Sequence, residues 1–272
     1  MISWKQIVQR VGIAAAVSFP ASSGAHEFWV TPDSFQGARG KEIKISLRVG
    51  DGWPGVERVR SENHFIRFVA FDHLGERKVP GQLFGDPAGQ IRLRSNGPLT
   101  ILYESRPQYS ELDATTFEQY LRDEGLESIV EQRRLLGEQL KPGRELYSRR
   151  AKAIVQGADN RAIVDRGTGT DLELSLRSYM PGAKGTSSVR VSLSWRGKQV
   201  KNALVNAFIS GTSAPISART DSRGIANFSL PQSGVWLFSS VHMVRLPSGT
   251  QADWQSLWSS LTVELDQRRV KR

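Results

Sequence analysis

The 272-residue chain has no cysteine, which excludes disulfides, thiolate metal sites, iron–sulfur clusters and cysteine nucleophiles. Histidine is scarce, with four residues, so metal or acid–base chemistry would depend on these imidazoles and on carboxylates. The sequence also lacks G-x-S-x-G, H-E-x-x-H and G-x-x-x-x-G-K-S/T, the motifs of serine hydrolases, zinc proteases and phosphate-binding loops. We therefore expect a protein that is not an enzyme.

Long hydrophobic runs are missing as well. Residues 11–19 (VGIAAAVSF) form a short apolar run that follows Lys5 and Arg10, and small residues at Ser23 and Ala25 come after it. This is the layout of a secretory signal peptide, and the run is far shorter than the roughly 20 residues of a spanning helix. We expect residues 1–25 to be cleaved after Ala25, which would leave a periplasmic chain with no membrane span.

The net charge is +10, from 37 lysines and arginines against 27 acidic residues. Two of these positive charges belong to the predicted signal peptide, and the end of the chain, 266–272 (DQRRVKR), carries four more in a predicted basic tail. The other basic residues are interspersed along predicted strands and helices. No single basic patch remains, so we expect no nucleic-acid partner.

Alternating apolar residues predict a β-rich first unit over 26–165. The segment 41–49 (KEIKISLRV) alternates apolar and polar residues, and 64–71, 99–103 and 145–155 are further strand candidates. Between these strands, about 115–140 has helical spacing, with Thr115 and Glu118 as a candidate capping box. The pattern favours two short helices packed on this first sandwich.

The β pattern resumes over 171–265. Residues 188–195 (SVRVSLSW) alternate, and further strands are predicted over 203–209, 225–230 and 235–244, separated by turns rich in glycine, proline and aspartate. The fold class we expect is mainly β. It has two β-sandwich domains, the second immunoglobulin-like or transthyretin-like, with a short helical insertion between them.

Several segments in order resemble one family of exported bacterial proteins. They include HEFWVTPDSF, LRVGDGWPG, GRELYSRRAKAIV and TDSRGIANFSLPQSGVWLFSSVHMV, and the resemblance covers essentially the whole mature chain. The family is domain of unknown function 4198, which is distantly similar to the NikM-like components of nickel and cobalt uptake. The resemblance implies a metal-related role, with His26 and His242 at motif positions. The chain departs from the pattern at Asp51, where many members carry histidine or glutamate.

Cleavage after Ala25 would make His26 the N-terminal residue. Its free α-amine and its imidazole Nδ1 could then hold one metal ion together, an arrangement absent from the uncleaved chain. The alternative is that the cleavage site falls before a histidine that only packs beside Phe28 and Trp29. Both interpretations stay open at this point.

His242 is the second candidate ligand, because it lies in a predicted strand that is apolar on both faces. It could complete a set of three nitrogens suited to Cu(II) and acceptable to Ni(II), or it could be a core histidine bonded to a backbone carbonyl. Asp51 and Glu104 are possible outer oxygen ligands. We expect His73 in a surface turn and His64 in a structural role at the start of a strand.

The expected function is a periplasmic carrier or accessory factor in metal uptake or homeostasis. It would bind one divalent nickel, cobalt or copper ion, and an inner-membrane metal permease is a possible partner. The first alternative is an envelope interaction module that binds no metal. The second is a copper-dependent oxidase with the same N-terminal histidine, since copper oxygenases use this chelate too.

Overall fold

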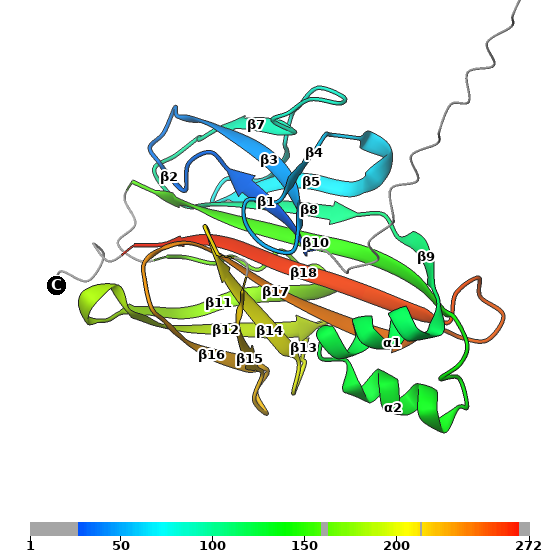
Figure 1. The fold of residues 1–272 in the computed structure, drawn as a ribbon. Helices are drawn as coiled ribbons and strands as arrows, with labels where there is room; N and C mark the ends of the chain where they lie inside the picture. Colours follow the sequence, from blue (N-terminus) through cyan, green and yellow to red (C-terminus); the bar gives the residue numbers. More distant parts are fainter. Residues whose placement is uncertain (1–26, 159–162, 213, 267–272) are drawn as a thin grey trace, which may run out of the picture.

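The computed structural model describes residues 27–158, 163–212 and 214–266. The predicted signal peptide, His26 and residues 267–272 of the basic tail lie outside the described residues. The described part contains eighteen strands and two α-helices, which confirms the mainly β fold class with a short helical segment between strands (Figure 1). Neither helix is long and apolar enough to cross a membrane, within the ranges described.

The strands predicted over 41–49, 64–71, 99–103 and 145–155 are present among the ten strands of the first half. In chain order they are β1 (Glu27–Pro32), β2 (Gln36–Gly37), β3 (Glu42–Gly50), β4 (Val56–Arg58), β5 (Phe65–Asp72), β6 (Gly75–Lys78), β7 (Gly89–Arg92), β8 (Leu99–Ser105), β9 (Gln108–Leu112) and β10 (Gly143–Gly157). The helices α1 (Ala114–Asp123) and α2 (Glu127–Leu135) lie between β9 and β10.

The second half is all β. Its strands are β11 (Leu172–Pro181), β12 (Ser187–Trp195), β13 (Lys198–Gln199), β14 (Leu204–Ile209), β15 (Ile216–Arg219), β16 (Ile225–Leu230), β17 (Gly234–Arg245) and β18 (Trp254–Leu265). The tight turn from β12 to β13 places Arg196 and Gly197 at positive φ, 49° and 75°, as a two-residue hairpin turn requires.

A single ten-stranded sheet runs through both halves of the chain. Its order is β15-β14-β17-β18-β10-β8-β5-β6, with β2 and β9 also paired to β10. The two long strands at its middle, β10 and β18, pair in parallel from Glu145 and Trp254 to Ile154 and Val263. The two predicted sandwiches therefore share one continuous sheet.

The two cores lie on opposite faces of this sheet. On β10, Ala151 and Ala153 belong to the core beneath β1 and β3, whereas Ile154, which points the other way, belongs to the core with β11 and β12. Figure 1 shows the small N-terminal sheet (β1, β3, β4, β7) above the long strands and the sheet of β11, β12, β13 and β16 below them.

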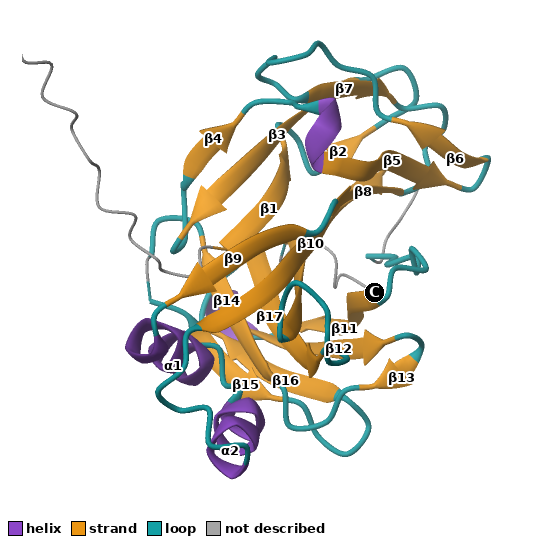
Figure 2. Ribbon diagram, turned by 90° about the vertical axis from the view of Figure 1, so that its right-hand side faces the viewer, coloured by secondary structure: helices purple, strands orange, loops and turns teal. Residues whose placement is uncertain are grey.

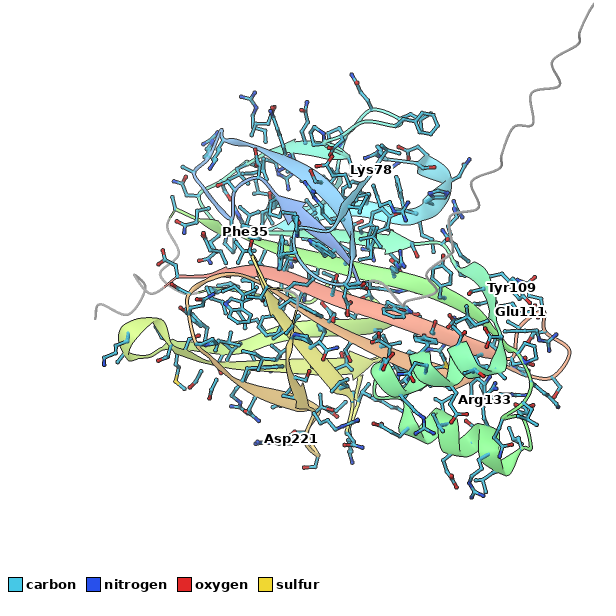
Figure 3. The ribbon with its side chains drawn as sticks, in the orientation of Figure 1. Phe35, Lys78, Tyr109, Glu111, Arg133 and Asp221 are labelled. Carbon is cyan, nitrogen blue, oxygen red and sulfur yellow. The ribbon has the colours of Figure 1, made fainter. Side chains whose placement is uncertain are left out.

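The helices cover a different place from the one expected. Phe117 and Leu121 of α1 pack with Val241 of β17 and Trp258 of β18, so the helices rest on strands from the second half of the chain. Arg133 is labelled on α2 in Figure 3. Its guanidinium lies over the Phe117 ring, 4.9 Å from the ring centroid. A strand pattern cannot reveal this position, because it follows from the pairing of β10 with β18.

The predicted helix cap is also shifted. Asp113, and not Thr115, is the N-cap of α1, and its carboxylate accepts a hydrogen bond from the Thr116 backbone N–H at 2.9 Å. Both residue types can cap a helix. The helix begins at Ala114, directly after Asp113, so Thr115 already lies inside its first turn.

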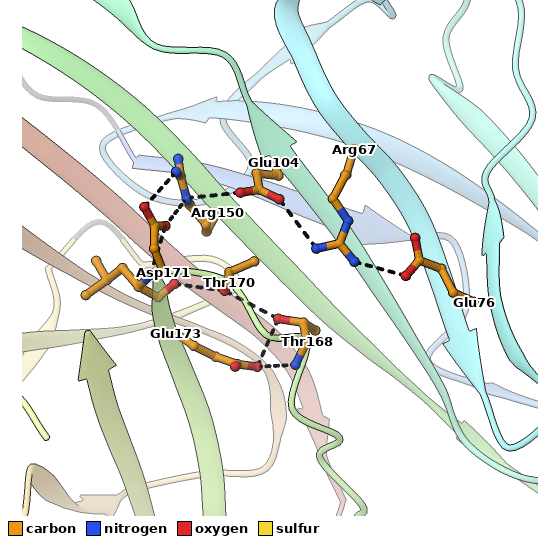
Figure 4. Close-up of polar contacts among 9 residues, drawn as sticks. Arg67, Glu76, Glu104, Arg150, Thr168, Thr170, Asp171 and Glu173 are labelled. Carbon is orange, nitrogen blue, oxygen red and sulfur yellow. Dashed lines mark hydrogen bonds and ion pairs between the residues drawn. The ribbon is translucent and has the colours of Figure 1, made fainter. Parts of the chain in front are cut away.

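A charged network ties the connection between the halves to the sheet. Lys152 of β10, 3% exposed, donates to Asp165 at 2.8 Å and to Glu173 at 3.0 Å. Beside it, Arg150 of β10 pairs with Asp171 at 2.7 Å (Figure 4). These ion pairs join β10 to residues 165–173 on the face of β10 that also carries Ile154.

Candidate functional site

His242 lies near the end of β17, on the face that carries Trp236 and Phe238 into the second core. Its ring centroid is 4.7 Å from that of Trp195 on β12. The Nε2 atom is buried and has no hydrogen-bond partner in the described part of the chain, and burial lowers the pKa of the imidazole. The ring is therefore neutral at neutral pH, with one nitrogen unsatisfied.

His26 lies outside the described residues, but its neighbour Glu27 is placed. The Glu27 carboxylate accepts a hydrogen bond from the Ser239 hydroxyl at 2.7 Å. Ser239 and His242 point to opposite faces of β17, because three positions separate them. The first described residue after the predicted cleavage site therefore lies on the other side of the sheet from His242.

Three carboxylates gather at the start of β1. Glu27 pairs with Gly50 in the register of β1 and β3, and Asp51 follows directly. Burial is the largest cause that raises the pKa of Glu27 to about 7, and the charge of Asp51 adds to it, while Ser239 and Arg149 act in the opposite direction. Burial together with the charges of Glu27 and Asp51 raises the pKa of Glu124, at the end of α1.

These carboxylates influence each other through space without forming a preassembled metal cluster. Among the residues that the structure describes, no three histidine, aspartate or glutamate side chains are grouped closely enough to hold a metal ion.

The remaining candidates lie apart. Glu104 of β8 faces the underside of the sheet, where its carboxylate is 3.6 Å from Arg67 and 3.7 Å from Arg150. It is therefore part of the charged network and not of the group at Glu27. His73 is exposed in the turn between β5 and β6, where sequence patterning predicts it. His64 is exposed at the edge of a cavity.

This cavity, of about 370 Å³, lies at one end of the N-terminal core, where β1, β3 and β4 approach β8, β9 and β10. Figure 2 shows β9 and β10 crossing beneath β1 and β4 in this part of the molecule. Phe28, Tyr103 and Tyr147 provide aromatic surface, and Arg58, His64 and Arg149 provide basic groups. None of the described residues that line the cavity is acidic.

Arg149 is the unusual residue of the cavity. On β10 it occupies the face of Tyr147, Ala151 and Ala153, so the strand directs an arginine toward the end of an apolar core. Its guanidinium lies 5.4 Å from the Phe28 ring and 5.3 Å from the Tyr147 ring. Its Nε is buried with no hydrogen-bond partner, and desolvation lowers the pKa of the group.

Sequence reasoning missed both Glu27 and Arg149 as site residues. The signal for Arg149 is present in YSRRAKA, where alternation places one arginine on the same face as two alanines of the core. Recognising it requires knowing which face of β10 the N-terminal sheet covers. Glu27 gives no such signal, because β1 is buried on both faces and has no polar side.

Comparison with curated proteins and with solved structures finds no match. The family profile described as "Domain of unknown function (DUF4198)" matches residues 23–244, which is most of the chain. The chain therefore belongs to the DUF4198 family.

Proposed function

We propose that the mature protein is periplasmic and binds one divalent first-row transition-metal ion, nickel, cobalt or copper, at an N-terminus formed by His26. In this role it serves as a carrier or accessory factor in metal uptake or homeostasis, with an inner-membrane metal permease as its possible partner. The α-amine and imidazole of His26 are the proposed chelating pair.

One observation supports this proposal most directly. The described chain begins at a buried carboxylate, Glu27, and the carboxylates of Asp51 and Glu124 lie close enough to interact with it electrostatically. A concentration of acidic groups beside a new amino terminus favours a cation there, and carboxylate oxygens can complete the coordination of an imidazole-bound metal. On this basis we assign the oxygen donors to Glu27 or Asp51. His242 as the third nitrogen stays a prediction.

Calorimetric titration with Ni(II), Co(II) and Cu(II) tests the proposal. Protein that begins at His26 should bind about one equivalent, and protein with a single glycine placed before His26 should lose at least tenfold in affinity, because the amine is no longer available to the chelate. Equal uptake by the two proteins would disprove the N-terminal site.

Two variants separate the candidate donors. Asp51→Asn should weaken binding if the carboxylates contribute, since the amide is a poorer ligand of the same size. His242→Ala should leave the metal affinity unchanged if the ligands come only from the face of the sheet on which Glu27 lies. If His242→Ala lowers the metal affinity and Asp51→Asn does not, the third ligand is His242.

A further inference from the structure

We propose that the cavity at the end of the N-terminal core binds a small organic carboxylate with a flat apolar body, whose carboxylate pairs with Arg149. The proposal does not depend on the metal proposed at the N-terminus. It rests on three features of the described residues: an arginine without a polar partner, aromatic walls on both sides of it, and a basic rim.

Arg149 is half-buried, with no polar partner for its guanidinium among the described residues. Its guanidinium makes no hydrogen bond or ion pair with any described side chain, and its Nε is closed off from solvent. The most deeply buried of the described arginines each have a polar partner: Arg60 pairs with Glu62 at 2.6 Å, Arg133 donates to the Glu138 carbonyl, and Arg150 pairs with Asp171. Single nitrogens of Arg133 and Arg150 also lack a partner, but neither guanidinium is without any polar contact. An unpaired buried charge loses hydration without compensation, so Arg149 is a candidate for an external anion.

The walls suit a flat apolar group. Phe28 and Tyr147 lie within about 5.5 Å of the guanidinium, and Tyr103 lies 5.0 Å from Phe28 by ring centroids. Burial raises the pKa of Tyr103 to about 12, so its hydroxyl keeps its proton and can donate to an anion. Aromatic side chains around a few polar groups are typical of small-molecule sites, and 370 Å³ falls within their usual size range.

The rim adds positive charge without an opposing acid. Arg58 and His64 are exposed where the cavity opens, and no ion pair involves either of them in the described part of the chain. The carboxylate whose charge acts on the pKa of Arg149 is that of Glu27, and it already accepts a hydrogen bond from the Ser239 hydroxyl. The cavity therefore attracts anions and has no built-in anion of its own.

A carboxylate fits this site better than a bare phosphate. A planar guanidinium pairs with a carboxylate through two parallel N–H donors, and the aromatic residues add affinity only if the ligand has an apolar body. One buried arginine also suits a single negative charge. A hydrated inorganic ion has no apolar surface to bury against these rings.

The test uses protein that begins at His26, with a panel of benzoate, 2-naphthoate and decanoate, and with 2-naphthamide and inorganic phosphate for comparison. At least one carboxylate of the panel should bind saturably and shift the NMR signal of the Arg149 Nε–H group. The neutral amide and phosphate should each bind at least tenfold more weakly.

Three variants control the result. Arg149→Met should weaken carboxylate binding by tenfold or more, and Arg149→Lys should restore it only in part, because lysine keeps the charge but loses the planar fork. Arg177→Met, at an exposed position on β11, should bind as the unchanged protein does. The proposal is overturned if no carboxylate binds, if phosphate or the amide binds equally well, or if Arg149→Met binds normally.

Discussion

The two sandwiches share one sheet, but different kinds of side chain lie at the ends of their hydrophobic cores. The C-terminal core consists of apolar side chains, and its Trp236 and Phe238 are fully buried. His242 lies on the same face of β17, and burial lowers the pKa of its imidazole, which keeps the ring neutral. The N-terminal core opens into a cavity at Arg149 and is flanked by the buried carboxylate of Glu27. The C-terminal core therefore has the composition of a purely structural core, whereas the end of the N-terminal core carries charged side chains where packing would favour apolar ones.

This difference indicates where stability and where binding reside. Buried charges lower stability unless they are paired, so a protein that retains them is expected to use them. Substitutions in the C-terminal core should therefore cost stability alone, whereas substitutions at Arg149 or Glu27 should cost binding and leave the fold as stable as before or more stable.

The largest effect is expected in the C-terminal core. Phe238→Ala should lower the free energy of unfolding by about 4 kcal/mol, because it removes a ring that packs edge-on against Phe228 and leaves a cavity. Urea denaturation monitored by tryptophan fluorescence measures it. In contrast, Tyr147→Ala at the open cavity should cost less than half as much, and equal losses would contradict the contrast between the two ends.

The charged connection between the sandwiches should give the next largest effect. Lys152→Ala should lower the free energy of unfolding by about 3 kcal/mol, because Asp165 and Glu173 would lose the cation buried between them. The exposed Lys198→Ala serves as the matched control and should change stability little. If both variants unfold at the same urea concentration, the network contributes nothing measurable.

Glu27 predicts a pH-dependent stability. Its pKa is raised from 4.5 to about 7 in the folded protein, where it faces Ser239, Arg149, Asp51 and Glu124. Between pH 4.5 and 7 the unfolded chain releases this proton while the folded chain keeps it. The stability present below pH 4.5 is therefore lost as the pH rises to 7, by about 3 kcal/mol.

Glu27→Gln should remove this dependence, because glutamine has no proton to release and can still accept the Ser239 hydrogen bond. We expect the variant to match the unchanged protein near pH 4 and to be more stable near pH 8. Metal-free urea titrations at the two pH values measure the difference. A variant that is less stable at both would show that the carboxylate itself supports the fold.

The smallest effect is expected for Arg149→Met. It should leave the free energy of unfolding unchanged or raise it by about 1 kcal/mol, because methionine fills similar space without a desolvated charge. The same variant should raise the pKa of Glu27 further, since Arg149 is one of the groups that lower it. A clear loss of stability would identify Arg149 as a structural residue and weaken the case for a ligand.

Much of the secondary structure could be predicted from local pattern. Alternation located β3 and β12 within one residue, because each has one face in a core, and β17, which is apolar on both faces, was located by the turn residues before it. The helical segment was predicted, but its cap at Asp113 was missed, since two candidate caps stood close together in the sequence. Of the candidate site, His242 lies in the strand predicted for it and its Nε2 atom is buried, whereas the electrostatic interaction of Glu27 with Glu124 joins residues almost a hundred positions apart.

The sequence by itself determined the mainly β class, the helical segment, the family resemblance and the expected signal peptide, because periodicity, turn residues and short motifs are local properties. Only the tertiary structure decided that β10 and β18 pair in parallel, that the two cores occupy opposite faces of one sheet, and that Arg149 ends an apolar core. Those outcomes depend on strand register and sheet order, which arise from packing between segments far apart in the chain.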